Sequence, residues 1–215
     1  MIVGSIKENI SLEKRISITP ESAKNIIALG LNVCLETNYA KHIGIDNQDY
    51  ENVGVTIFNS AEEVIKNCNL LMQVECPSDQ IIKNIKEKTI LIGIFNPSKN
   101  QSKLEEIIKK NIKIFSLELL PRISRAQSMD VLSSQSNLAG YRSVIESIYE
   151  YEKAIPMMMT AAGTVPAAKV LVIGAGVAGL QAIATAKRLG AIVSATDVRQ
   201  ASKEQVESLG GKFLT

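Results

Sequence analysis

The 215-residue sequence has one histidine, three cysteines and no marked excess of either charge. Its 24 basic and 22 acidic residues give a formal net charge of +2, so the charge balance indicates neither a nucleic-acid partner nor an acidic tail. No apolar run approaches the ~18 residues that span a bilayer, and the N-terminus has no signal-peptide pattern. We therefore expect a globular protein that does not itself cross a membrane.

The cysteines and the histidine are too few for a disulfide framework or a metal centre. Cys34, Cys68 and Cys76 are odd in number and form no CxxC pair, which favours a reducing compartment and a packing role for all three. His42 is the only histidine, so we expect no metal site, and a catalytic histidine would have to be this one.

Short apolar runs alternate with helix-like segments over the first 120 residues. Continuous runs of this kind are typical of parallel strands buried on both faces, and their alternation with helices favours a doubly wound sheet. Thr19 before Pro20 and Ser60 before Glu63 mark helix starts, and Gly30 marks a helix end. The expected strands are 1–6, 31–36, 70–75, 90–95 and 112–119, and the expected helices between the later strands are 61–67, 80–87 and 103–110.

Pro121 ends this alternation, and the polar residues 121–137 are expected to form a long loop. Residues 137–154 have apolar side chains at helical spacing, which predicts a helix that links two domains and stops at Pro156. Tyr141 on this helix is expected to be a core residue. The predicted fold class is α/β, with two Rossmann-like doubly wound parallel sheets of which the second is truncated. The predicted domains are an N-terminal Rossmann-like domain (1–135), a linker helix (136–155) and the N-terminal half of an NAD-binding Rossmann domain (156–215).

Residues 169–199 carry the strongest motif of the sequence. Gly174, Gly176 and Gly179 form G-x-G-x-x-G between an apolar strand and a helix that ends at Gly190. The first glycine allows the tight turn, the second lets a pyrophosphate approach the backbone, and the third allows close packing of helix and strand. A glycine turn without a ligand is the alternative, and the strand–turn–helix context favours a dinucleotide site.

An acid closes the second strand of this motif. Asp197 lies about 20 residues beyond the glycines, where a carboxylate accepts hydrogen bonds from both ribose hydroxyls and repels a 2′-phosphate, which favours NAD(H) over NADP(H). Arg199 leaves NADP(H) open, since arginine can bind a 2′-phosphate; stacking near the adenine, or exposure, is the other interpretation. The predicted cofactor-binding residues are Gly174, Ala175, Gly176, Val177, Gly179, Asp197 and Arg199.

The segments 122–144, 156–191 and 195–199 resemble the NAD(H)-binding alpha subunit (domain I) of proton-translocating nicotinamide nucleotide transhydrogenases. The resemblance implies hydride transfer from NADH to NADP⁺ held on a separate domain III, coupled to proton translocation by a membrane subunit. It also implies a homodimer that lies in the cytoplasm at the inner face of the bacterial inner membrane.

The resemblance also places four residues near the nicotinamide: Arg122, Gln127, Asp130 and Ser133. A glutamine can donate to and accept from a carboxamide, and arginine and aspartate can pair to hold the loop. An ordinary polar loop with an Arg122–Asp130 ion pair is the alternative. Direct hydride transfer requires two rings held face to face rather than a general acid or base, which suits a segment poor in titratable groups.

Alanine dehydrogenase is a related family with a different requirement, because amino-acid oxidation needs groups that bind a keto acid and move protons. Arg15 matches that family's arginine, but Gln73 stands where its lysine would be, and the strand at 90–95 has no histidine. The sequence therefore disfavours an alanine-dehydrogenase-type reaction.

Only 16 residues follow Arg199, whereas a dinucleotide-binding domain has about six strands in two halves. We expect either a piece of a longer transhydrogenase subunit or the product of an interrupted gene. A non-catalytic remnant that binds adenosine or a partner is a third alternative.

Overall fold

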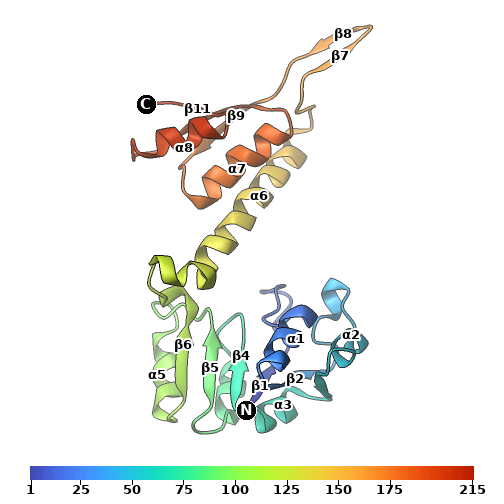
Figure 1. Cartoon of the computed structure of the whole chain (residues 1–215), viewed down its shortest axis with the longest axis vertical. Helices are drawn as coiled ribbons and strands as arrows, with labels where there is room; N and C mark the ends of the chain where they lie inside the picture. Colours follow the sequence, from blue (N-terminus) through green and yellow to red (C-terminus); the bar gives the residue numbers. More distant parts are fainter. The chain divides into compact units, whose positions relative to one another are not determined.

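The computed structural model describes all 215 residues in two compact units, Met1–Met129 and Asp130–Thr215 (Figure 1). The first unit is a parallel sheet of order β3-β2-β1-β4-β5-β6, which is the doubly wound order. Its strands are β1 (Ile2–Ser5), β2 (Asn32–Glu36), β3 (Thr56–Phe58), β4 (Leu70–Met72), β5 (Ile90–Gly93) and β6 (Lys113–Ser116). Its helices are α1 (Pro20–Ala28), α2 (Asn47–Glu51), α3 (Ala61–Asn67), α4 (Asp79–Asn84) and α5 (Gln101–Lys109), with 3-10 turns η1 (Lys41–Ile43), η2 (Leu117–Leu119) and η3 (Ser124–Met129).

The predicted helix boundaries of the first unit are confirmed at two starts and one end. The Thr19 hydroxyl accepts a hydrogen bond from the Ser22 N–H at 3.1 Å, and the Ser60 hydroxyl accepts one from the Glu63 N–H at 3.3 Å. Gly30 follows α1 with a φ of +79°, a left-handed conformation that ends helices and favours glycine.

Two hydrophobic clusters fill the two faces of this sheet. Side chains alternate between the faces along each strand, so Val33 and Leu35 pack with α1 and α2, while Cys34 packs with α3, α4 and α5. Burial raises the pKa of Cys34 to about 12 and that of Cys68 to about 11, so both thiols stay protonated. Both are free and buried, as the predicted packing role requires.

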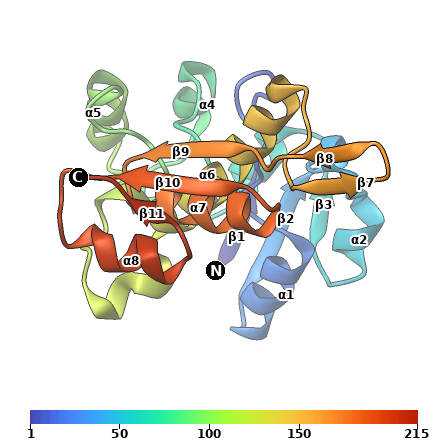
Figure 2. The same cartoon turned by 90° about the horizontal axis from the view of Figure 1, so that it is seen from above.

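The second unit contains a three-stranded parallel sheet of order β11-β10-β9, with β9 at one edge (Figure 2). A long helix, α6, packs on α7 so closely that a Cβ on Gly140 would lie 2.1 Å from the carbonyl oxygen of Ala178. An antiparallel hairpin of β7 and β8 precedes the sheet. The elements are α6 (Val131–Tyr151), β7 (Met158–Thr160), β8 (Gly163–Val165), β9 (Lys169–Ile173), α7 (Val177–Arg188), β10 (Ile192–Thr196), α8 (Ser202–Ser208) and β11 (Lys212–Phe213).

The predicted α/β fold class with parallel, Rossmann-like sheets is confirmed. None of the helices is both long enough and apolar enough to cross a membrane. The prediction of a loop over 121–137 is wrong, because these residues form η3 and the first turns of α6. The physical reason is Asp130, whose carboxylate accepts a hydrogen bond from the Ser133 N–H at 2.9 Å and so starts the helix six residues earlier than predicted.

Two further expectations for α6 are wrong. The helix ends at Tyr151, where Glu152 adopts a left-handed φ of +51°, so it stops before Pro156 is reached. Tyr141 is 50% exposed rather than a core residue. Only one part of the predicted apolar stripe is buried in the unit, around Val144.

Candidate nucleotide-binding site

The glycine turn between β9 and α7 has a different structural requirement at each glycine. Gly174 has a φ of +96°, which a residue with a Cβ rarely adopts. A Cβ on Gly179 would lie 1.8 Å from the Gly174 carbonyl oxygen, so only glycine permits this approach of helix to turn. A Cβ on Gly176 would have no heavy atom within 4 Å, so this position faces open space. The turn therefore leaves room for a ligand at the middle glycine alone.

The N-terminus of α7 supplies hydrogen-bond donors beside this open space. Gly176 is the N-cap and offers no side chain to the first N–H groups of the helix. The N–H groups of Val177, Ala178 and Gly179 have no acceptor within the helix, as in the first turn of any α-helix. Together with the positive end of the helix dipole, they can hold a phosphate or pyrophosphate.

Asp197 follows β10 and contacts the glycine turn directly. One carboxylate oxygen, Oδ2, accepts a hydrogen bond from the Ala175 N–H at 2.7 Å. The other, Oδ1, accepts from the Arg199 N–H at 2.8 Å and from Arg199 Nε at 3.0 Å. The Asp197 side chain is 6% exposed and that of Arg199 is 62% exposed, so the arginine lies over the carboxylate from the solvent side.

These contacts strongly favour the charged form of Asp197. The Arg199 guanidinium, followed by the backbone N–H groups of Arg199 and Ala175, holds the pKa of this carboxyl well below its usual range. Asp197 is therefore an acceptor at any physiological pH, as a ribose contact requires. The Ala175 contact was not predicted, because sequence alone does not show which N–H of the turn the acid reaches.

The four residues predicted to lie near a nicotinamide fall on neighbouring elements of the chain. Arg122 and Gln127 are exposed residues before and within η3, in the first unit. Asp130 and Ser133 lie in the second unit at the start of α6, and Ser133 Oγ donates to Asp130 Oδ2 at 2.6 Å. The structure therefore brings Asp130 and Ser133 together through helix capping.

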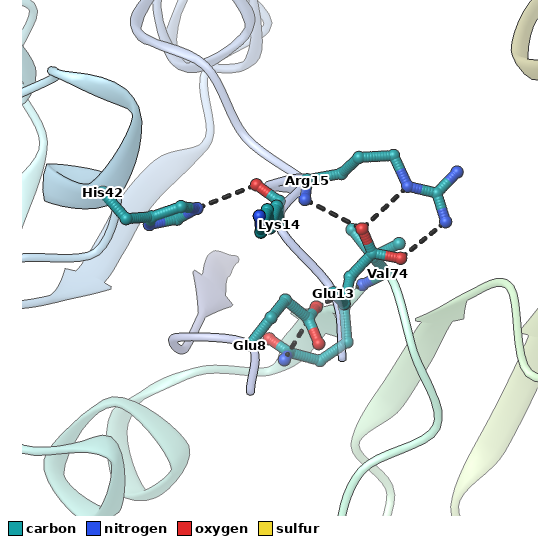
Figure 3. Close-up of polar contacts among 7 residues, drawn as sticks. Glu8, Glu13, Lys14, Arg15, His42 and Val74 are labelled. Carbon is teal, nitrogen blue, oxygen red and sulfur yellow. Dashed lines mark hydrogen bonds and ion pairs between the residues drawn. The ribbon is translucent and has the colours of Figure 1, made fainter. Parts of the chain in front are cut away.

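The first unit has a cleft of its own, of about 800 Å³, at the carboxyl ends of β1, β4 and β5. Parallel sheets bind ligands where strands on either side of the first strand diverge, and β1 between β2 and β4 is such a point. Arg15 lines this cleft but is paired with Glu13, whose carboxylate accepts from Arg15 Nε at 2.9 Å and from Nη2 at 2.6 Å (Figure 3). The side chain that matches the substrate-binding arginine of alanine dehydrogenases is thus held by its own loop.

Gln73, at the position of that family's lysine, is a buried structural residue. Its Oε1 accepts from the Ile6 N–H at 2.9 Å, and its Nε2 donates to Glu8 at 3.2 Å. His42 is exposed outside this group, with Nε2 2.8 Å from the Lys14 carbonyl oxygen (Figure 3). No basic side chain of lysine or histidine type therefore stands where Gln73 does.

Two protein-family models match the chain almost from end to end. The alanine dehydrogenase/PNT N-terminal domain matches residues 4–139, and the alanine dehydrogenase/PNT C-terminal domain matches residues 143–215. The NAD(P) transhydrogenase subunit alpha of Rhodospirillum rubrum is 50% identical over 221 residues, and that of Rickettsia prowazekii is 47% identical over 220 residues. The match covers 100% of this chain and 57% of each relative.

Solved structures agree with these matches. The transhydrogenase of Sinorhizobium meliloti superimposes on 100% of this chain with a TM-score of 0.96 and 49% identity, covering 64% of that structure. An L-alanine dehydrogenase superimposes with a TM-score of 0.85 at 22% identity, covering 100% of this chain and 61% of that structure, which shows the shared fold. The predicted resemblance is confirmed, and the chain belongs to the alanine dehydrogenase/PNT family.

Proposed function

We propose that this chain is the NAD(H)-binding component of a proton-translocating transhydrogenase. The observation that carries the proposal is the open glycine turn at the start of α7 with the ionised Asp197 beside it. In this proposal NADP(H) is held on a partner domain III and a membrane subunit couples hydride transfer to proton translocation. The chain would then lie in the cytoplasm, at the inner face of the bacterial inner membrane.

The residues of the site have separable tasks. NADH, when bound, would supply the hydride. The N–H groups at the start of α7 would hold the pyrophosphate, and Asp197 would accept from the ribose hydroxyls. Arg122, Gln127, Asp130 and Ser133 are proposed to position the nicotinamide, and none of them needs to exchange a proton for a direct hydride transfer.

Arg199 bears on the choice between the two nicotinamide nucleotides. Its guanidinium neutralises part of the Asp197 charge, so repulsion of a 2′-phosphate is weaker than the carboxylate alone would give. A preference for NADH over NADPH is still expected, because Asp197 is fixed by the turn while Arg199 is exposed.

The test is a fluorescence titration of the 215-residue chain with NADH and, separately, with NADPH. Saturable binding that prefers NADH, and is weakened in Asp197→Asn, supports the proposal. Arg188→Gln, on the last turn of α7, is the matched control for a loss of charge away from the turn. A chain that is folded by circular dichroism and binds neither nucleotide would contradict the proposal and favour a non-catalytic remnant.

We also propose that the protein is a homodimer, and the hairpin of β7 and β8 supports this. All its residues are exposed, including Met157, Met158 and Met159, and it extends away from the rest of the second unit (Figure 1). Exposed apolar side chains on a protruding hairpin are typical of an association surface. Sedimentation of Met159→Asp beside the parent chain tests this, with a dimer in the parent and a monomer in the variant as the expected result.

A further inference from the structure

The outer edge of β9 has the hydrogen-bonding groups of a strand but no neighbour. Ile192 N–H donates to the Ala168 carbonyl at 2.8 Å, and Gly174 N–H donates to the Thr196 carbonyl at 2.8 Å. In a parallel ladder, alternate residues point their N–H and C=O groups to the same side, so the even-numbered residues from 168 to 174 face β10. The N–H and C=O groups of Lys169, Leu171 and Ile173 therefore point to the free edge.

The face of the sheet that carries these side chains is also uncovered. Leu171 is 57% exposed, Ile173 is 81% exposed, and Ile192 on β10 is 55% exposed. The register pairs Lys169 with Ile192 and Ile173 with Thr196, so these apolar side chains share one face. The opposite face packs Val170 and Val172 into the core with α6 and α7. Parallel sheets are normally covered on both faces, so this one presents an apolar surface that calls for a covering element.

A groove runs along the same edge within the second unit. A cavity of about 420 Å³ is lined by the whole of β9 and by one side of α6 that includes Val144, Ile148 and Tyr151. Apolar atoms thus lie both beside the free edge and above it. A strand placed in the groove would pair with β9 and pack under α6.

The first unit shows what occupies the equivalent position in a doubly wound sheet of this same chain. There the first strand, β1, pairs in parallel with β2 on one side and with β4 on the other. Helices α1 and α2 belong to the β2 side and cover one face, whereas α3, α4 and α5 belong to the β4 side and cover the other. The second unit has the order β11-β10-β9, which corresponds to β3-β2-β1 with the β4 side open.

We propose that the free edge of β9 is a docking site for a parallel β-strand, and the uncovered face for the helix that accompanies it. The occupant is the polypeptide that makes up the remainder of the transhydrogenase alpha relatives, since this chain matches only 57% of their length. The inference rests on the sheet and holds whether or not the glycine turn binds NAD(H).

The experiment co-expresses the 215-residue chain with the segment of the Rhodospirillum rubrum subunit that lies outside the match, and isolates the complex without nucleotide. A 1:1 complex is expected. In residue-resolved hydrogen exchange, the amides of Leu171 and Ile173 should become at least tenfold slower than in the chain alone. The amides of Val170 and Val172 already bond to β10 and should change little.

A pair of matched variants separates the docking site from general solubility. Leu171→Asp puts a charge on the uncovered face and should reduce recovery of the complex at least tenfold. Ile108→Asp puts the same charge on α5 of the first unit, where the parent side chain is 61% exposed, and should leave recovery unchanged. Equal losses in both variants would overturn the proposal. So would a complex without protection of Leu171 and Ile173, a failure to form any complex, or the same protection produced by two copies of this chain.

Discussion

The two parallel sheets of this protein start alike and differ beside their first strand. In the six-stranded sheet β1 has a neighbour on each side, whereas β9 in the three-stranded sheet has one. The polar groups at the carboxyl ends differ in the same sense. In the first unit Arg15 is paired with Glu13 and Gln73 is hydrogen-bonded within the unit, while in the second the glycine turn leaves α7 N–H groups open. A cleft at the end of a parallel sheet therefore indicates a binding site only when its polar groups are not already paired by the fold.

Substitutions in the glycine turn should have the largest effects and would sharpen this contrast. Gly179→Ala places a Cβ within 1.8 Å of a backbone carbonyl oxygen, so we expect it to lower the free energy of unfolding by about 3 kcal/mol or more. Gly176→Ala meets no atom and should change stability by less than about 0.5 kcal/mol. Urea unfolding followed by circular dichroism measures both, and equal losses would show that the turn is not as open as described.

Asp197→Ala tests the open site more directly. A hydrogen bond to a charged group contributes about 1.5–3 kcal/mol, so NADH affinity should fall roughly 10- to 100-fold. Arg199→Ala should leave NADH binding close to that of the parent and weaken NADPH binding, because the carboxylate is no longer shielded from a 2′-phosphate. Equal weakening of both nucleotides in Arg199→Ala would instead indicate a contact with the part they share.

The first unit should show a pH dependence that comes from Glu8. Burial raises the pKa of this carboxyl from 4.5 to about 7, against the lowering effect of its hydrogen bond from the Val74 N–H. Glu13 and Glu75 raise it further by charge repulsion. The folded chain therefore keeps a proton that the unfolded chain loses above pH 4.5, and this contribution to stability is lost as the pH rises through 7.

Urea unfolding at several pH values between 5 and 8 should show the parent losing stability relative to Glu8→Gln, which cannot ionise. The comparison of the two chains cancels the opposite trend expected from Glu13 and Asp197, whose pKa values are lowered. A constant difference between the parent and the variant across this range would show that Glu8 is not held in its neutral form.

Arg15→Ala should have the smallest effect. The guanidinium is half exposed and its pair with Glu13 lies at the edge of the cleft, so we expect a loss of about 1 kcal/mol or less in stability. NADH titration should be unchanged, because the arginine is not placed in the nucleotide site. A loss of NADH affinity with stability preserved would contradict the view that the first unit's cleft is internally paired.

Sequence patterns predicted the parts of the fold that depend on local chemistry. Thr19 and Ser60 cap helices as their spacing indicated, and the roles of Gly174 and Gly179 in the turn follow from a motif whose geometry leaves little choice. Asp130 lies in the segment predicted as a loop, although an acid that can accept from an N–H three residues later is a recognisable helix start.

The remaining misses have two causes. Helix α2, strand β3 and the hairpin of β7 and β8 are short, so their periodicity is weak; the Asp46–Asp49 capping box and Gly163 in the hairpin turn were the available signals. The Arg199–Asp197 pair could not be predicted, since it depends on how the chain turns after β10 and on one exposed side-chain rotamer.

The distribution of thiols gives this molecule a built-in reporter. All three cysteines lie between positions 34 and 76, within the first unit, and the two buried ones belong to the same hydrophobic cluster on one face of its sheet. A thiol reagent can reach Cys34 and Cys68 only when that cluster opens. The rate of their alkylation therefore times the opening of the six-stranded sheet alone, and a substitution in the second unit that leaves this rate unchanged acts without disturbing the first.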